Sequence, residues 1–235
     1  MSIAENIAAI RSKMDEAARN CGRDPREILL CAATKMNDAD AVRQAIAGGV
    51  DCCGENRVQE LVAKQKENAY EGAPVHFIGH LQTNKVKQVV GKVDLIQSVD
   101  SLRLLKAIDT EAAKQGIQQK ILLEINVGNE ESKSGFQAAE ILPLLEHISD
   151  FSHILVRGLM AIPPISQNSG DNRKFFQEML QLSVDITAKK YDNVSMDFLS
   201  MGMSDDYEDA ICCGSTMIRV GTAIFGARNY AKLHQ

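Results

Sequence analysis

Short apolar segments alternate with amphipathic segments along almost the whole chain, and this alternation restricts the possible folds more than any other feature. The apolar segments have the length of buried strands. We expect eight of them, at 29–35, 50–54, 75–79, 94–99, 120–127, 154–161, 197–200 and 217–220. Strands that alternate with helices form a parallel sheet, and eight such units in 235 residues predict a closed (β/α)8 TIM barrel. A doubly wound open sheet is the alternative.

The segments between these strands have helical periodicity. We expect helices at 38–47, 58–68, 83–90, 101–114, 137–148, 171–189, 205–212 and 222–231. An additional helix at 2–20 precedes the first strand, because Ile3, Ile7, Ile10 and Met14 recur at helical spacing. No linker or break in composition divides the chain, so we predict one barrel domain over residues 1–235.

The first expected strand ends on Lys35. In a TIM barrel, functional residues gather where strands end and helices begin. A lysine with a buried stem and a partly desolvated amine loses its proton more easily and becomes a nucleophile. A solvated lysine that marks the strand end is the simpler interpretation, because lysine is almost never fully buried.

The last two strands end in segments that suit an anion. Ser200, Met201 and Gly202 follow the seventh strand, and Gly221 and Thr222 follow the eighth. Phosphate in this fold often binds at these loops, where backbone N–H groups and hydroxyls can donate to it. Ordinary turn and cap chemistry is the alternative for the same residues.

A lysine amine and a phosphate site at one barrel mouth suggest pyridoxal 5'-phosphate (PLP), held as a Schiff base on Lys35. Arg219 would then face the pyridine nitrogen. Because arginine cannot give up its proton, it donates a hydrogen bond and leaves that nitrogen unprotonated, which makes the ring a weaker electron sink. The pattern therefore favours binding or mild exchange over chemistry that needs a stabilised carbanion.

A series of motifs carries a resemblance that runs almost end to end. The motifs are ATK at 33–35, GENRVQE at 54–60, HFIGHLQTNK at 76–85, SVD at 98–100, SKSG at 132–135, RGLMAIP at 157–163, LSMGMSDD at 199–206 and GSTMIRVGTAIFG at 214–226. Through them the chain closely resembles the pyridoxal phosphate homeostasis protein family. Thr34 stands where many relatives have serine, which keeps a hydroxyl.

The resemblance implies a barrel like the N-terminal domain of alanine racemase. It implies that Lys35 is the Schiff-base lysine and that Arg219 faces the pyridine nitrogen. The other cofactor contacts it implies are Asn56 near the ring and Ser200, Gly221 and Thr222 at the phosphate, and Met201 is expected among the cofactor-binding residues. Members are thought to bind, buffer and hand over PLP to apo-enzymes and to affect amino-acid and 2-oxo-acid balance, with no catalysed reaction generally assigned.

A PLP-dependent amino-acid racemase is the competing function. Racemases of this type take a second base from a separate β domain of a partner subunit. This chain stops at Gln235, just after the last expected barrel helix, so we expect no such domain and no catalytic residue. A phosphosugar isomerase on the same fold would need acidic catalysts at the strand ends, where only Glu55 qualifies.

Composition sets the remaining expectations. The net charge of -5, without a basic block, argues against a nucleic-acid partner. No apolar run is long enough to span a bilayer and no secretion signal is recognisable, so we expect a cytoplasmic protein, which we predict to be a monomer. All six cysteines are expected to be reduced core residues.

Two further interpretations concern metal binding and surface lysines. His76 and His80 would lie roughly 13 Å apart on a strand, so we expect no metal site there. Lys85 and Lys133 are expected to be solvated surface charges, with a lid or delivery role as the alternative.

Overall fold

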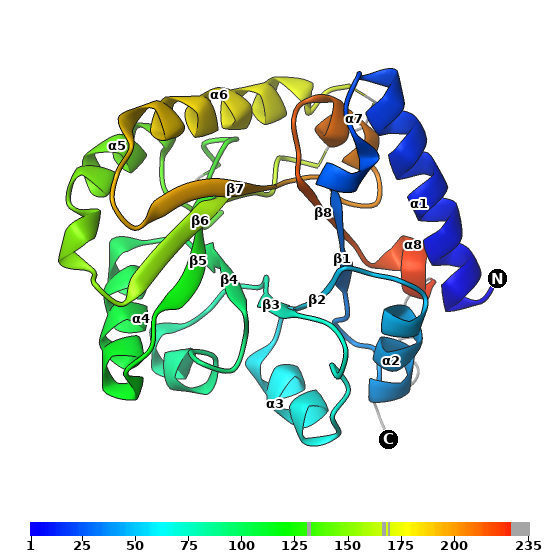
Figure 1. Ribbon diagram of the computed structural model, residues 1–235, viewed down its shortest axis with the longest axis horizontal. Helices are drawn as coiled ribbons and strands as arrows, with labels where there is room; N and C mark the ends of the chain where they lie inside the picture. Colours follow the sequence, from blue (N-terminus) through cyan, green and yellow to red (C-terminus); the bar gives the residue numbers. More distant parts are fainter. Residues whose placement is uncertain (131–132, 166–167, 169, 227–235) are drawn as a thin grey trace.

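The computed structural model describes residues 1–130, 133–165, 168 and 170–226. Its eight strands form a closed barrel in sequence order, in which every neighbouring pair is parallel (Figure 1). The strands are β1 (Leu29–Ala33), β2 (Cys52–Glu55), β3 (Val75–Phe77), β4 (Leu95–Val99), β5 (Gln119–Ile125), β6 (Ile154–Ala161), β7 (Val194–Ser200) and β8 (Met217–Val220). β1 pairs with both β2 and β8, so the TIM-barrel prediction is confirmed and the open sheet is excluded.

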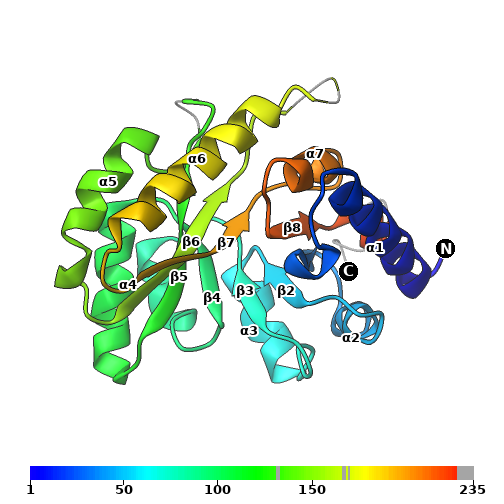
Figure 2. The same cartoon turned by 45° about the horizontal axis from the view of Figure 1, so that its top comes forward.

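Helices surround this barrel (Figures 1 and 2). They are α1 (Ile3–Asn20), α2 (Ala39–Ala47), α3 (Val58–Lys66), α4 (Leu102–Gln115), α5 (Ala138–Glu146), α6 (Arg173–Lys189), α7 (Tyr207–Cys212) and α8 (Thr222–Phe225), with 3-10 helices η1 (Pro25–Glu27), η2 (Thr83–Gln88) and η3 (Ile148–Asp150). Within the described residues, no helix is long and apolar enough to cross a membrane.

Most strands are buried on both faces, as alternation along β1 illustrates, whereas the first part of β7 is only partly buried. Leu30 and Ala32 belong to the main core between the sheet and the helices. Cys31 points the other way and packs with Cys52 and Met217 inside the barrel. A parallel sheet covered on both sides requires such near-continuous apolar strands. Polar groups inside the barrel are therefore exceptional, and each needs a hydrogen-bond partner.

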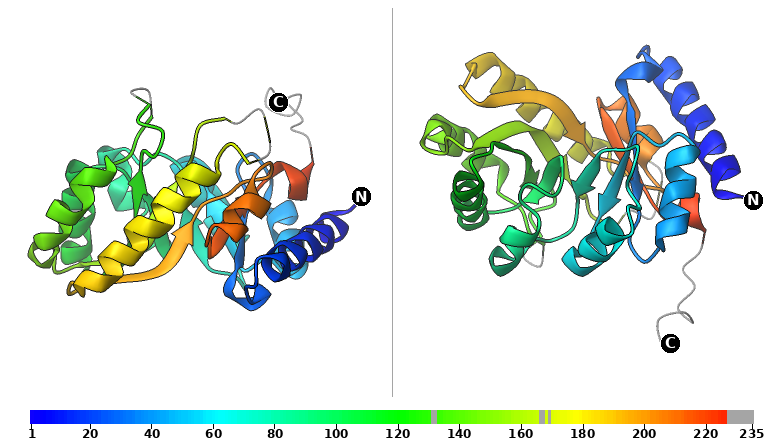
Figure 3. Two further views of the ribbon diagram at one scale, coloured as in Figure 1. Left: turned by 90° about the horizontal axis from the view of Figure 1, so that it is seen from above. Right: turned by 60° about the horizontal axis from the view of Figure 1, so that its bottom comes forward.

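The predicted N-terminal helix is confirmed as α1, which lies on the outside of the barrel against α2, α7 and α8 (Figure 3). Ser2 begins it with a capping box, since its hydroxyl accepts from the Glu5 N–H and its own N–H donates to the Glu5 carboxylate. Ile7 and Met14 are buried against the barrel. Each such side chain contributes roughly 1.5–3 kcal/mol to folding.

The prediction that all six cysteines are reduced is wrong for two of them. Cys21, at the end of α1, forms a disulfide with Cys212, at the end of α7, across a Cα–Cα distance of 5.3 Å. The packing of α1 on α7 brings together residues that lie 191 positions apart. The other four cysteines, Cys31, Cys52, Cys53 and Cys213, are free and buried as expected.

Several element boundaries differ from the predictions, and three of the differences have a clear physical reason. The helix expected at 83–90 is the shorter 3-10 helix η2, in which Val86 is buried, and the buried Val89 follows three residues later as its C-cap. β7 begins three residues early, because the Asn193 carbonyl already accepts from a β6 N–H. α8 ends at Gly226, whose φ of +86° stops the helix, and the rest of the predicted 222–231 helix lies outside the described residues.

Candidate functional site

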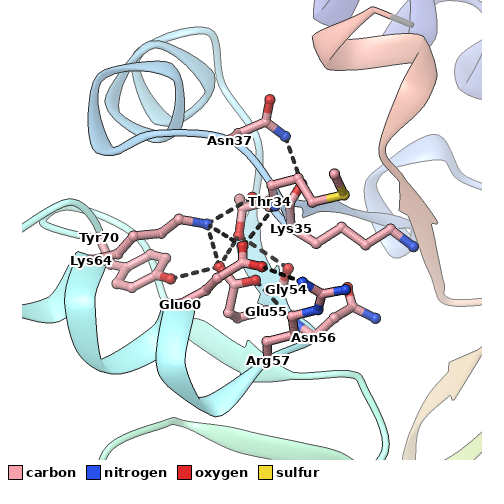
Figure 4. A network of polar contacts seen from close by, with 11 residues as sticks. Thr34, Lys35, Asn37, Gly54, Glu55, Asn56, Arg57, Glu60, Lys64 and Tyr70 are labelled. Carbon is pink, nitrogen blue, oxygen red and sulfur yellow. Dashed lines mark hydrogen bonds and ion pairs between the residues drawn. The ribbon is translucent and has the colours of Figure 1, made fainter. Parts of the chain in front are cut away.

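Lys35 lies two residues beyond the end of β1, at the carboxyl edge of the barrel. The preceding Thr34 stays attached to the sheet, since its N–H donates to the Gly54 carbonyl at 2.9 Å. Lys35 itself is half-buried. Its side chain extends away from a cluster of polar residues behind it, towards the side on which Asn56 lies (Figure 4). The half-buried position of Lys35 is compatible with the partly desolvated lysine that was one of the two interpretations of the sequence.

The register of β1 and β8 brings the end of the chain to this lysine. Ala32 pairs with Val220, so Gly221 follows directly opposite the end of β1. A Cβ atom on Gly221 would lie 3.3 Å from the Ala33 carbonyl oxygen, closer than most real contacts. Thr222 is exposed and is the first residue of α8, where backbone N–H groups lack helical partners. Gly221 and Thr222 therefore lie at the same edge as Lys35.

Arg219 is a buried cation just inside this edge. Only 4% of its surface is exposed, and it sits opposite Cys31 in the β1–β8 register. Its guanidinium donates to the Ser200 hydroxyl at 2.6 Å and to the Ala161 carbonyl at 2.9 Å. Burial lowers the pKa of Arg219, but an arginine stays charged in a protein. Its orientation is therefore fixed by two acceptors.

Ser200 connects Arg219 to two more polar side chains inside the barrel. Its hydroxyl donates to the Gln97 carbonyl oxygen at 2.6 Å, and the Gln97 amide lies 2.9 Å from the Nδ1 atom of His76. All four side chains are buried. The sequence analysis missed Gln97, although a polar residue in an otherwise apolar strand is a usable signal. We refer to Arg219, Ser200, Gln97 and His76 as the interior chain.

Ser200 and Met201 are both held by hydrogen bonds within the protein. The Ser200 hydroxyl is held on both sides within the barrel, where it accepts from Arg219 and donates to Gln97. Met201 is fully buried, and its N–H and carbonyl are bonded to Met217 and Ser215. Their contact with a phosphate stays a prediction, and the structure ties both residues to the support of Arg219 and the β7–β8 edge.

Asn56 follows β2 and carries an unsatisfied atom. Its Oδ1 atom is buried and has no hydrogen-bond partner among the described residues. Its backbone N–H donates to the Glu55 carboxylate at 3.0 Å, and its backbone packs so closely on Gly79 that a Cβ there would come within 2.2 Å of the Asn56 carbonyl oxygen. A buried acceptor without a donor is costly unless a ligand supplies one.

Glu124 adds a titratable group inside the barrel. Burial raises its pKa to about 7, and the charge of Asp100 acts in the same direction, while Arg219 and His80 oppose the shift. The side chain is largely shielded from solvent. Sequence patterning did not reveal this carboxyl, because an acidic residue near a strand end is more often solvated.

The two histidines have separate environments. His76 belongs to the interior chain, whereas the His80 ring is exposed and lies 3.1 Å from the Asp100 carboxylate. The ligand atoms of His76, Cys31 and Cys52 all lie within 4.8 Å of one another inside the barrel, a cluster that sequence spacing could not predict. The His76 imidazole of this cluster already contacts Gln97 through Nδ1.

The two lysines with a suggested delivery role lie on different loops. Lys85 is half-buried in η2. Lys133 contacts the Glu130 carboxylate at 3.0 Å and donates to the Pro163 carbonyl at 3.2 Å. Part of the SKSG motif, Ser132, lies outside the described residues. A role for either lysine in transfer stays a prediction.

Comparison with known proteins shows the family to which this chain belongs. The family described as "Alanine racemase, N-terminal domain" matches residues 2–229. The pyridoxal phosphate homeostasis protein of Escherichia coli K12 is 40% identical over 233 residues, which cover 98% of each chain. The Haemophilus influenzae protein of the same name is 38% identical over 233 residues, again 98% of each chain. This chain belongs to the pyridoxal phosphate homeostasis protein family.

Solved structures agree with this membership. The structure of PipY from Synechococcus elongatus PCC7942 with PLP bound superimposes with a TM-score of 0.82 at 32% identity, covering 96% of this chain and all of PipY (100%). Alanine racemase from Streptomyces coelicolor is only 16% identical, with a TM-score of 0.69, so it shares the fold alone. The predicted resemblance to the homeostasis protein family is therefore confirmed.

Proposed function

We propose that this protein binds PLP as a Schiff base on Lys35 and buffers or delivers it within the cell, with effects on amino-acid and 2-oxo-acid balance. The observation that carries the proposal is the β1–β8 register, which places Lys35 beside Gly221 and Thr222 with Arg219 buried directly below. One edge of the barrel thus holds a nucleophilic amine, backbone N–H groups at the start of α8 and a fixed cation. This combination suits an aldehyde that carries a phosphate.

The residues present fit the cofactor. The orphaned Oδ1 atom of Asn56 needs a donor, which a ligand beside Lys35 can provide. Gly221 and Thr222 would hold the phosphate, and Arg219 would donate to the pyridine nitrogen. When bound, PLP supplies an electrophilic aldehyde and an electron-withdrawing ring. Arg219 cannot protonate the ring nitrogen, so this chain keeps the ring a weak electron sink.

Because the ring would be a weak electron sink, we propose a carrier and not an enzyme, with no catalytic residue. A racemase must move a proton on both faces of its substrate and stabilise the carbanion between the two transfers. A neutral pyridine beside Arg219 disfavours that intermediate state. The expected recipients are apo-forms of PLP-dependent enzymes. We propose a monomer in the cytoplasm, with no nucleic-acid partner, no membrane partner and no bound metal.

Cofactor titration and an exchange assay test these two parts of the proposal. PLP titrated into the wild type, Lys35→Ala and the control Lys133→Ala should give a Schiff-base absorbance in the wild type and the control, and none in Lys35→Ala. The loaded wild type, incubated with L-alanine in deuterated water, should show no steady exchange of the α-proton, and it should activate an apo-enzyme. Sustained exchange with turnover would establish the racemase instead.

A further inference from the structure

A buried ion pair lies directly behind Lys35. The Lys64 amine is 2.6 Å from the Glu55 carboxylate, and the two side chains are 7% and 0% exposed. The same carboxylate oxygen, Oε2, also accepts from the hydroxyls of Thr34 and Tyr70, each at 3.0 Å (Figure 4). Burial and the nearby Glu55 charge raise the pKa of Tyr70 well above its usual range, so Tyr70 stays a donor.

Lys64 and its second partner Glu60 hold the backbone on both sides of Lys35. Lys64 donates to the Thr34 carbonyl at 2.8 Å, on the side before the lysine. On the side after it, the Met36 N–H donates to the Glu60 carboxylate at 2.7 Å, and Glu60 in turn lies 3.4 Å from the Lys64 amine. Met36 has a φ of +63°, a left-handed conformation that a methionine adopts only when its surroundings enforce it.

Glu55 also fixes the residue that carries the orphaned acceptor. While its Oε2 atom binds Lys64, Thr34 and Tyr70, its Oε1 atom accepts the N–H of Asn56 at 3.0 Å. One buried carboxylate therefore sets the position of the Lys35 segment relative to Asn56. Lys64 meets the backbone next to Lys35 and Glu55 meets the backbone of Asn56, whereas the Lys35 side chain extends away from them (Figure 4).

We propose that Glu55 and Lys64 are positioning residues for Lys35, which set the rate and tightness of PLP capture without touching the cofactor. The inference rests on the proposed function, because it concerns the same lysine. Preorganised geometry accelerates the attack of an amine on an aldehyde, and small displacements of the nucleophile slow it. An ordinary buried ion pair would affect folding stability alone.

Three variants separate positioning from stability. Lys64→Met removes the cation and leaves Glu55 buried without its charge partner. Thr34→Val and Tyr70→Phe each remove one hydroxyl donor, keep the volume nearly unchanged and keep the ion pair. Lys114→Met is the matched control, since it removes an exposed lysine from a surface pair with Glu111 on α4. Folded protein is first verified by urea unfolding at the assay temperature.

The measurement is the rate and equilibrium constant of PLP capture by full-length protein, followed by Schiff-base absorbance across pH. We expect Lys64→Met to slow PLP capture and weaken PLP binding about tenfold or more, and Thr34→Val to do so about threefold. In both variants the dependence of PLP capture on pH should differ from that of the wild type. Lys114→Met should match the wild type. Should Lys64→Met fail to fold, Thr34→Val and Tyr70→Phe decide.

The positioning role is overturned when folded Thr34→Val, Tyr70→Phe and any folded Lys64→Met capture PLP with wild-type rate, affinity and pH profile. That result would leave the proposed function intact. A wild type that gives no Schiff base at all would instead overturn the proposed function, so the two failures are distinguishable.

Discussion

The guanidinium of Arg219 donates a 2.6 Å hydrogen bond to the hydroxyl of Ser200 inside the barrel. Both residues were predicted to contact the cofactor, and the structure links them to each other first. The Ser200 hydroxyl donates its own hydrogen bond to the side-chain oxygen of Gln97. The direction of the Arg219 side chain therefore depends on residues deeper in the barrel.

Gln97→Leu should weaken PLP binding although Gln97 is not expected to touch the cofactor. The substitution leaves the Ser200 hydroxyl without an acceptor, so the support of Arg219 loosens. Loss of one buried hydrogen-bond partner costs about 1–3 kcal/mol. We expect the Kd for PLP to rise about fivefold or more in a fluorescence titration. The surface control Gln65→Leu should leave it unchanged, and an unaltered Kd in Gln97→Leu would show that the interior chain does not orient Arg219.

Asn56→Ala should separate stability from binding. Without PLP, the buried Oδ1 atom of Asn56 has no partner in the described structure, so its removal should leave the unfolding free energy unchanged or raise it by up to about 1–2 kcal/mol. PLP affinity should fall at least tenfold. Urea unfolding and PLP titration measure the two effects, with the exposed Asn20→Ala as control. A variant that loses stability but keeps its affinity would contradict the role assigned to Asn56.

Glu124 should make the stability of the PLP-free protein depend on pH. Its pKa is raised from 4.5 to about 7 by burial, so the folded state binds the proton more tightly than the unfolded state. The resulting stabilisation is complete below about pH 4.5 and is lost as the pH rises through about 7. Glu124→Gln should remove roughly 1–3 kcal/mol of this dependence. Urea unfolding at pH 5 and pH 8 compares the two proteins, and identical pH profiles would disprove the shift.

Reduction of the Cys21–Cys212 disulfide should destabilise the protein strongly. The bond closes a loop whose ends are 191 residues apart, for which the chain-entropy model gives about 5 kcal/mol. We expect dithiothreitol and Cys21→Ser to lower the unfolding midpoint to a similar extent. Dithiothreitol added to Cys21→Ser should lower the midpoint no further, which controls for reduction itself. Peptide mapping that finds Cys21 and Cys212 alkylated without prior reduction would contradict the pairing.

Strand and helix alternation predicted the barrel because each element has its own hydrophobic period, which needs no knowledge of distant residues. Lys35, Gly221 and Thr222 could be placed at one edge for the same reason, since strand ends share an edge in a parallel barrel. The role of Ser200 could not be foreseen, because its partner Gln97 lies 103 residues away on another strand. The pairing of Cys21 with Cys212 depends on how α1 packs on α7, and the Glu55–Lys64 pair depends on which side chains of β2 and α3 face each other.

We propose that Lys35 is the residue that holds PLP. Borohydride reduction of the loaded wild-type protein, followed by digestion and mass spectrometry, measures this directly. We predict a single reduced pyridoxyl group on the peptide that contains Lys35, and none on Lys64, Lys85 or Lys133. A pyridoxyl group on any other lysine, with Lys35 unmodified, would contradict the account.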